Sequence, residues 1–176
     1  MPAAKTPRTQ RGASLLEALL AASIAGVLTT AAVPAMTDTL AQHRIAAATS
    51  DLFATFNLAR SEAIRRSSPV AVAPADKNDW ASGWRVFADR NDNGVHDDGE
   101  EVLLERPGTA AGITIRPYFG ATYSGKVLSY NSEGRLHRPG KYQLVIGRLV
   151  LTHHGLARSL CFASLGARVA TAATCD

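Results

Sequence analysis

Aromatic residues and cysteines are scarce in this sequence. Phe, Trp and Tyr make up 6% of the 176 residues while alanine is heavily used, so close helix contacts are expected rather than a core of bulky rings. Only Cys161 and Cys175 are present, both near the end of the chain. Oxidising compartments preserve disulfides, so an exported domain would pair these two cysteines. Two buried thiols are the alternative.

Recognisable catalytic motifs are lacking as well. The sequence contains no nucleophile elbow, no phosphate-binding loop and no CxxC pair. His153 and His154 adjoin each other, and neighbouring residues of a strand face opposite sides. A surface hairpin is therefore expected there, and not a bidentate metal site. These absences predict a protein that is not an enzyme and carries no cofactor.

The N-terminal part combines a basic head with a long apolar run. Residues 1–12 hold three basic residues and no acid, and the only charge in residues 13–33 is Glu17. A helix over this run is about 31 Å long at about 1.5 Å per residue, which is enough to cross a bilayer. The basic flank favours a cytoplasmic N-terminus. We therefore expect a single membrane-spanning helix over residues 13–34.

The position of the basic head bears on processing. An ordinary secretory signal has its cleavage site after the apolar run, whereas this head ends at Gly12, before the run. Cleavage between Gly12 and Ala13 would leave the apolar helix on the mature protein. A charge in hydrocarbon costs about 2.5–3.5 kcal/mol, so Glu17 needs a partner, which the new α-amino group of an adjacent subunit would supply. The alternatives are that Glu17 snorkels to the membrane edge, or that an uncut helix merely tethers a periplasmic domain.

The segment RGASLLEALLAASIAGVLTTAAVPAM resembles the class III signal of type IV pilins and type II secretion pseudopilins. The resemblance implies that a prepilin peptidase cuts after Gly12 and N-methylates Ala13, where the family usually has Phe. It also implies assembly roles for Glu17 and Pro34. A proline removes a backbone N–H and crowds the preceding turn, so Pro34 kinks the helix or marks where it melts during assembly. A simple helix boundary at Pro34 is the alternative.

Residues 35–67 are expected to continue as an amphipathic spine helix. Apolar residues recur at spacings of three to five, which predicts one buried stripe. Ser67-Ser68-Pro69 is expected to end the helix. The stripe comprises Leu40, Ile45, Ala48, Leu52, Phe56, Ala59 and Ala63, widened by Phe53 and Ile64.

Residues 68–176 change to short apolar runs separated by turn signals such as Asn93-Gly94 and Pro139-Gly140. With the long helix they predict an α+β arrangement, an antiparallel β-rich head on a helical spine. The expected strands are Val70–Ala73, Trp84–Ala88, Val102–Leu104, Ile113–Arg116, Val127–Tyr130, Tyr142–Ile146, Arg148–Leu151 and Leu160–Ala163.

Four segments of the chain resemble the GspH/FimT branch of minor pseudopilins and pilins: NLARSEAIRRSSPVAV, GWRVFADRNDNGVHDDGEEVL, SYNSEGRL and LCFASLGARV. The resemblance implies the pilin fold and a minor subunit of a type IV pilus or type II secretion system, which assembles into a filament through its N-terminal helix. The implied partners are other pilin or pseudopilin subunits, the prepilin peptidase and the inner membrane. The head would lie in the periplasm or on an extracellular pilus.

The segment from Asp89 to Glu100 fits the calcium-loop pattern D-x-N-x-N-G-x5-E, with Gly94 at the turn position. Its flank argues against an EF-hand, because the preceding GWRVF is typical of a strand and His96 takes a place that is usually apolar. Two interpretations stay open. The segment binds calcium, or it is a polar hairpin loop whose Asp and Asn side chains bond their own backbone.

Charge is divided unevenly along the head. Residues 76–105 carry 3 basic and 9 acidic residues, a net −6, while residues 106–176 carry 9 basic and 2 acidic residues, a net +7. A basic surface can bind DNA phosphates, and relatives in this branch bind DNA through Gly-Arg-x-Arg near the C-terminus. The nearest match here is Gly166-Ala167-Arg168-Val169, where Ala and Val replace the arginines of the motif. A DNA-binding minor pilin for natural transformation, using Arg168 and Arg158, is therefore the alternative function, and an ordinary solvated surface is the simpler interpretation. A dispersed patch would add Arg135, Arg138, Lys141 and Arg148.

Overall fold

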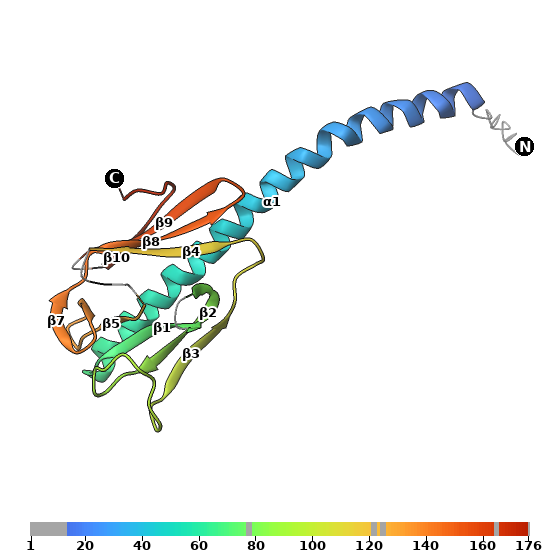
Figure 1. Ribbon diagram of the computed structural model, residues 1–176. Coiled ribbons are helices and arrows are strands. Elements are labelled where there is room, and N and C mark those ends of the chain that lie inside the picture. Colours follow the sequence, from blue (N-terminus) through green and yellow to red (C-terminus); the bar gives the residue numbers. More distant parts are fainter. Residues whose placement is uncertain (1–13, 77–78, 121–122, 124–125, 164–165, 176) are drawn as a thin grey trace, which may run out of the picture. The chain divides into compact units, whose positions relative to one another are not determined.

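One helix followed by ten strands makes up the described chain, in the order shown in Figure 1. Contacts divide the chain into two compact units, residues 1–40 and residues 41–176. The expected leader, Gly12 and Ala13 lie outside the described residues. The structure is a computed structural model that describes residues 14–76, 79–120, 123, 126–163 and 166–175, without the side chains of residues 28–35 and 142.

Helix α1 (Leu15–Arg66) accounts for all the described secondary structure of the first unit. It runs through Pro34 without interruption, which excludes the helix end that was the alternative interpretation of this proline. The expected membrane span covers residues 13–34. Among the residues that the structure describes, no helix is both long enough and apolar enough to cross a membrane.

Within the second unit, one face of α1 forms the centre of the core. The predicted stripe is confirmed except at two positions, since Leu40 and Ile64 are 45% and 49% exposed. Each is one residue, or about 100°, away from a buried alanine, Ala41 or Ala63, and so faces solvent. The buried stripe consists of Ala41, Ile45, Ala48, Leu52, Phe56, Ala59 and Ala63.

The end of α1 follows the prediction and has a clear local cause. Ser67 adopts a left-handed backbone conformation with φ of 50°. Its N–H donates to the carbonyl of Ile64, and the N–H of Ser68 donates to the carbonyl of Ala63. These two bonds close a Schellman-type cap that satisfies carbonyls at the helix C-terminus, and Pro69 then prevents further helix.

The strands form two antiparallel sheets, which confirms the predicted α+β arrangement of an antiparallel β-rich head on a long helix. The six-stranded sheet has the order β3-β2-β1-β5-β6-β7 and the four-stranded sheet has the order β10-β9-β8-β4. Their bounds are β1 (Val70–Asp76), β2 (Asp79–Ala88), β3 (Val102–Pro107), β4 (Thr114–Phe119), β5 (Leu128–Tyr130), β6 (Leu136–Arg138), β7 (Lys141–Leu144), β8 (Gly147–His153), β9 (Leu156–Ala163) and β10 (Gly166–Ala170).

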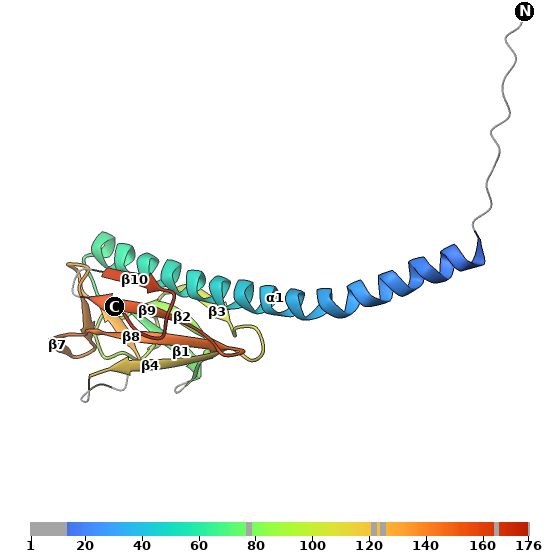
Figure 2. The same cartoon turned by 90° about the horizontal axis from the view of Figure 1, so that it is seen from above.

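Both sheets pack against the second half of α1 in a single core, as Figures 1 and 2 show. Trp80 and Trp84 of β2 are almost completely buried on one side of it, and Phe162 of β9 on the other. The indole N–H of Trp84 donates to the hydroxyl of Thr55 at 2.9 Å, so a polar group buried on the helix meets its partner across the core.

An ion-pair network holds the end of α1 and predicts a pH effect. Hydrogen bonds from Arg65 and then Arg66 lower the pKa of Glu62 to about 2, and Arg66 also reaches Glu101 at 2.6 Å. Because the pKa of Glu62 is lower in the folded state, its ion pairs stabilise the fold fully at pH values above the ordinary pKa of 4.5. This stabilisation is lost as the pH falls towards 2. Glu62→Gln should therefore lower the free energy of unfolding at pH 7. The loss should be small, because water screens the charges of these exposed groups. Urea unfolding at pH 7 and near pH 2 would show that the stability difference between Glu62→Gln and the unaltered chain shrinks in acid. An equal difference at the two pH values would contradict a role of the ionised Glu62 carboxylate in stability.

Candidate functional site

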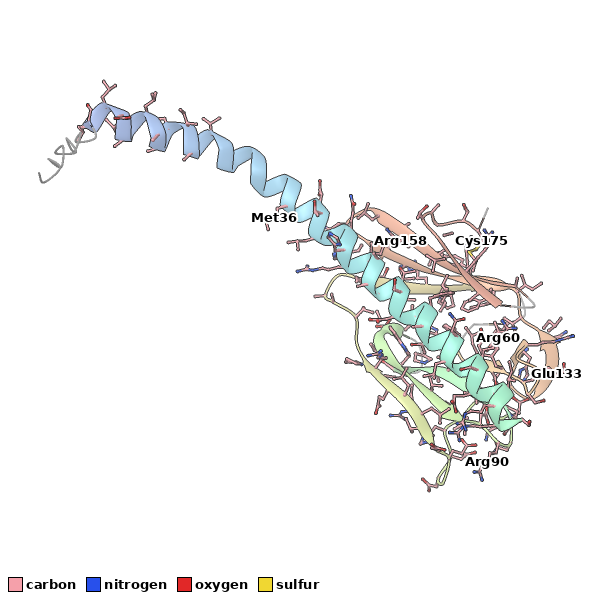
Figure 3. All side chains as sticks on the ribbon, turned by 180° about the vertical axis from the view of Figure 1, so that it is seen from behind. Met36, Arg60, Arg90, Glu133, Arg158 and Cys175 are labelled. Atoms are coloured by element: carbon pink, nitrogen blue, oxygen red, sulfur yellow. A yellow bond between two sulfur atoms is a disulfide. The ribbon has the colours of Figure 1, made fainter. Side chains whose placement is uncertain are left out.

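The strongest candidate for a functional surface is the first part of α1. Every described side chain from Ser14 to Val27, and again from Met36 to Leu40, is exposed, as the outward-pointing sticks in Figure 3 illustrate. Ser23 donates its hydroxyl to the carbonyl of Leu19 at 2.8 Å, so its polarity is satisfied within the helix. An apolar surface of this extent marks a site of interaction with protein or lipid. Its large side chains, 53–81% exposed, are Leu15, Leu16, Leu19, Leu20, Ile24 and Val27.

Glu17 is the only charge on that surface among residues 14–27. It lies in the first turn of α1, where the helix dipole favours an acid, and its side chain is exposed. No cation of the described chain forms an ion pair with it. A partner for this carboxylate therefore has to come from the N-terminal segment outside the description or from another molecule.

The Asp89–Glu100 segment is a loop between β2 and β3 that is held together by its own side chains. Asp89 is buried, and its carboxylate accepts the N–H groups of Asn93 at 3.0 Å and Gly94 at 2.9 Å. Asn91 and Asn93 both donate to one oxygen of Asp97, at 2.8 and 2.7 Å. These bonds are the ones expected of a polar hairpin loop.

Burial has the largest effect on the pKa of Asp89, the buried acid of this loop. It raises the pKa of Asp89, although the two backbone N–H groups that the carboxylate accepts act in the opposite direction. Within the described ranges, no three or more His, Cys, Asp or Glu side chains gather into a group that could hold a metal ion.

A contact that the sequence did not reveal ties this loop to the β6–β7 turn. The imidazole of His137 lies 2.8 Å from a carboxylate oxygen of Asp92, and Gly140 donates its N–H to the same carboxylate at 3.1 Å. His137 is buried and separated from Asp92 by 45 residues, so no local pattern announces the pair. The contact fixes the loop against the six-stranded sheet.

Arginines gather on the outer face of the four-stranded sheet. Cys161 on β9 is paired with Arg168 on β10 and with Arg148 on β8, and paired residues of antiparallel strands share a face. Arg148 is in turn paired with Tyr118 on β4, and its guanidinium lies 5.2 Å from the centre of that ring. Arg158 is three residues from Cys161 and faces the opposite side of the sheet. The structure therefore brings Arg168 close to Arg148 and separates it from Arg158.

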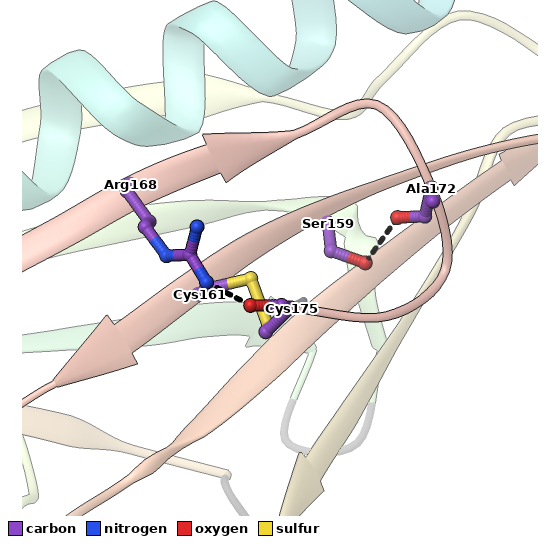
Figure 4. Close-up of a disulfide and its surroundings, with 5 residues drawn as sticks. All are labelled: Ser159, Cys161, Arg168, Ala172 and Cys175. Carbon is purple, nitrogen blue, oxygen red and sulfur yellow. Dashed lines mark hydrogen bonds between the residues drawn. A yellow bond between two sulfur atoms is a disulfide. The ribbon is translucent and has the colours of Figure 1, made fainter.

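The two cysteines form a disulfide, which confirms one of the two interpretations left open by the sequence. The bridge attaches the C-terminal tail to β9, with the Cα atoms of Cys161 and Cys175 5.9 Å apart. Figure 4 shows two further ties of the tail, from Ser159 to the carbonyl of Ala172 at 2.7 Å and from Arg168 to the carbonyl of Cys175.

Removing this disulfide should destabilise the head. The bridge spans a sequence separation of 14 residues, and closing a loop of about that size contributes about 3 kcal/mol in the chain-entropy model. We expect a Cys161→Ser, Cys175→Ser double variant to lose about that much free energy of unfolding in urea. Dithiothreitol should shift the unfolding midpoint of the unaltered chain to a lower urea concentration and leave the midpoint of the double variant unchanged. A variant as stable as the unaltered chain would show that the bridge does not contribute.

The hairpin expected at His153 and His154 is confirmed, because His153 of β8 pairs with Leu156 of β9, but the strand alternation expected of the two histidines is not. β8 ends at His153, while His154 lies in the following turn with φ of 47°. Alternation along a strand therefore does not apply to the pair, and the two rings meet edge to face with centres 4.5 Å apart. The side chain of His153 is buried and that of His154 is exposed.

Comparison with known proteins places these features in context. Residues 48–166 match the family described as type II transport protein GspH. The chain is 32% identical over 162 residues to the pilin-like protein PilA1 of Thermus thermophilus, which covers 90% of this chain and 96% of that protein. The fold resembles that of the type IV minor pilin FimU of Pseudomonas aeruginosa, with a TM-score of 0.55, 20% identity, and coverage of 74% of this chain and 89% of FimU. It also resembles the minor pseudopilin EpsH of the Vibrio cholerae type 2 secretion system, with a TM-score of 0.52, 12% identity, and coverage of 73% and 97%.

Proposed function

Because the chain belongs to the GspH family of pilin-like subunits, we propose that it joins the filament of a type IV pilus or a type II secretion system through the first part of α1. The observation that carries the proposal is the continuous exposed apolar surface from Leu15 to Val27, interrupted by the single carboxylate of Glu17. Such a surface is costly to leave in water, and helices of neighbouring subunits would cover it.

The proposal includes a processing step. A prepilin peptidase removes residues 1–12 after Gly12 and methylates the new N-terminus at Ala13. The amine so created is four residues before Glu17 in the sequence, and in a filament it neutralises the Glu17 carboxylate of an adjacent subunit. Before assembly, the apolar part of α1 is held at the inner membrane and the head lies in the periplasm. The basic residues in front of it and the exposed side chains of α1 support this arrangement.

Intact-mass measurement of the chain recovered from its native envelope tests the processing step. We expect a polypeptide that begins at Ala13 and carries the mass of one added methyl group. A Gly12→Val variant serves as the matched control, because it should keep residues 1–12. A native chain that still begins with Met1 would overturn the proposal in favour of a tethered domain.

Filament entry is tested separately by sedimentation. Filaments sheared from cells, or pseudopili formed after overproduction of the major subunit, are pelleted and probed for this chain. We expect the chain in the pellet of processing-competent cells and in the membrane fraction of cells without the peptidase. A chain that never enters the filament pellet although its N-terminus is processed would contradict a structural role in the filament.

A second candidate function is DNA binding by a minor pilin, and one specific observation favours it. Arg168 on β10, Cys161 on β9, Arg148 on β8 and Tyr118 on β4 follow one another across the outer face of the four-stranded sheet. The Arg148 guanidinium lies over the Tyr118 ring and Arg168 is exposed two strands away, and two cations and a ring on one face suit phosphate contact and base stacking.

A gel-shift at low salt with the full chain in detergent tests this second function. We expect retardation of DNA that weakens when Arg148 and Arg168 are both replaced by alanine. The slope of the logarithm of the binding constant against the logarithm of the salt concentration should become shallower by about 2, because two phosphate contacts are lost. Arg158→Ala is the matched control, because this arginine faces the other side of the sheet and should leave binding unchanged. Absence of retardation by the unaltered chain would exclude DNA binding.

A further inference from the structure

A pocket of about 450 Å³ lies on the face of the six-stranded sheet that is opposite the core. Alternation along β2 places Trp84 and Val86 in the core and leaves Arg85 and Phe87 on the other face, where both line the pocket. Ala73 of β1 is paired with Arg85 and shares that face. The pocket is bounded by β1, β2, the connection between β2 and β3, and residues 126–127 before β5, and is here termed the outer pocket.

The connection between β2 and β3 forms a fixed wall of the outer pocket. Gly94 has a left-handed backbone conformation with φ of 74°, and a Cβ atom at this position would lie 2.9 Å from Pro139 and 3.5 Å from Val127. The ring of His96 packs edge-on against Phe87, with centres 5.3 Å apart. Because these contacts already order the wall, a ligand would lose little affinity to the ordering of this loop.

The lining of the outer pocket is mostly apolar, and its side chains on β1 are small. Ala73, Pro74 and Ala75 leave space above the sheet, which Val95 and Val127 border. Val95 is 58% exposed although it lines a cavity, so an apolar occupant would cover surface that water now contacts. A cavity of this size with an apolar lining and a few polar groups is typical of small-molecule sites.

The permanent charges of the outer pocket are positive. Lys126 is exposed and forms no ion pair with an acid of the described chain. Arg85 donates one guanidinium N–H to Glu105 at 2.7 Å, but its Nε is buried and has no hydrogen-bond partner in the described structure. Buried donors without acceptors are costly. A small rotation of the guanidinium towards a carboxylate in the pocket would give this N–H an acceptor.

The charges around the outer pocket limit the size of the anion. None of its described lining residues is acidic, and nearby acids of the β2–β3 connection have partners elsewhere, Asp92 at His137 and Glu101 at Arg66. Residues 76–105 nevertheless carry a net −6. This acidic surrounding repels a polyanion such as a nucleic acid much more than it repels a single carboxylate at the two cations.

Backbone pairing also favours a compact ligand. The part of β1 beside the pocket extends past β5, which pairs only with residues 70–72 of β1. Pro74 in this part has no backbone N–H to donate to an added strand. A bound polypeptide would therefore gain little from strand addition here, and side chains have to hold the occupant.

We propose that the outer pocket binds a small monocarboxylate with an apolar body, an aromatic or branched aliphatic acid. The carboxylate lies between Lys126 and Arg85, and the apolar body packs against Val95, Val127 and Phe87. This binding goes beyond the proposed filament function and does not rest on it, because none of the described lining residues of the pocket belongs to α1.

Calorimetric titration of the full chain in lipid nanodiscs tests the proposal, with 4-phenylbutyrate as the probe and empty nanodiscs as the blank. We expect a dissociation constant of about 0.1–1 mM, which is ordinary for a ligand of about twelve non-hydrogen atoms. The uncharged 4-phenylbutanamide has the same shape and should bind at least about tenfold more weakly, because it brings no charge to the two cations. Absence of binding, or equal binding of the acid and the amide, would overturn the inference.

Variants separate the two cations from the rest of the basic side chains. Lys126→Ala should weaken binding by about fivefold, the upper end for an exposed ion pair, and Lys126→Arg should keep most of it. Arg90→Ala is the matched control, because Arg90 is exposed on the same β2–β3 connection without lining the pocket, and it should leave binding unchanged. Ala75→Phe, at an exposed position of β1, should abolish binding by filling the space. Equal affinities of the Lys126→Ala and Arg90→Ala chains, each with an unaltered urea midpoint, would contradict the inference.

Methyl NMR of the same sample locates the probe. Addition of 4-phenylbutyrate should shift the methyl signals of Val95 and Val127 and leave that of Ile146 in place, whereas a shift confined to Ile146 would refute the site. Displacement of the probe by an oligonucleotide or an acidic peptide would make the pocket a site for that polymer and the inference wrong. A chain that enters filaments but does not bind the probe refutes this inference alone, and a chain that binds it but never enters filaments refutes the proposed function alone.

Discussion

Replacement of Glu17 by alanine is expected to remove the chain from its filament while leaving the head folded. We expect the fraction of chain in the filament pellet to fall by at least about tenfold, which corresponds to about 1.4 kcal/mol. The measurement is a quantitative blot of sheared or pelleted filaments against total chain, with Glu17→Ala and unaltered chains expressed at equal levels.

The physical reason lies in the environment that the proposed assembly would create around Glu17. In the free chain the carboxylate is exposed on the first turn of α1 without a cation from the described residues. Once apolar helices surround it, the same carboxylate needs a partner, and two unit charges 4 Å apart attract by about 4 kcal/mol at an effective dielectric constant near 20. Alanine keeps the helix but leaves the amine of the neighbouring subunit uncompensated.

Two controls separate this electrostatic effect from others. Asp38→Ala removes an exposed acid from the same helix, outside the apolar run, and should enter filaments like the unaltered chain. Glu17→Gln keeps the shape and loses the charge, so it should behave like Glu17→Ala. Normal incorporation of either Glu17 variant would show that no buried ion pair sets the position of the subunit.

The fold could be predicted from the sequence wherever a periodic pattern or a turn signal was strong. The buried stripe on α1 and its end before Ser67 follow from spacing and local chemistry, and each of the eight expected strands has a counterpart in the structure. The prediction failed where pattern was absent. Strand β6 has only three residues, and β10 reads GARVA, without alternation of large apolar side chains, so neither was found.

The candidate sites could also be predicted only where local sequence carried the signal. The disulfide and the polar hairpin loop were among the stated interpretations, because the first follows from export of a chain with two cysteines and the second from residue type and local spacing. The contact between His137 and Asp92 and the row from Arg168 through Arg148 to Tyr118 depend on strand order and register. Pairings between distant strands leave no signal in local sequence, so these groups appear only in the folded chain.

The second large effect is expected in the core, at Phe56. Its side chain is completely buried on α1 and contacts aromatic rings of both sheets. Ring centres lie 4.7 Å away at Phe162 of β9, 6.0 Å at Trp80 of β2 and 6.4 Å at Tyr130 of β5. Because aromatic residues are scarce in this chain, this cluster supplies much of the bulk that joins the helix to the two sheets.

Phe56→Ala should therefore lower the free energy of unfolding by about 3–5 kcal/mol, through lost burial and the cavity left among the neighbouring rings. This is a large fraction of the roughly 5–15 kcal/mol that stabilises a typical domain. Both tryptophans, Trp80 and Trp84, are buried in this core, so their fluorescence during urea unfolding reports the change directly. Phe53→Ala is the matched control, because Phe53 is only partly buried at the edge of the same core and should cost less. A loss below about 1 kcal/mol at Phe56, the level of an average substitution, would show that the helix and the sheets are held together by other contacts.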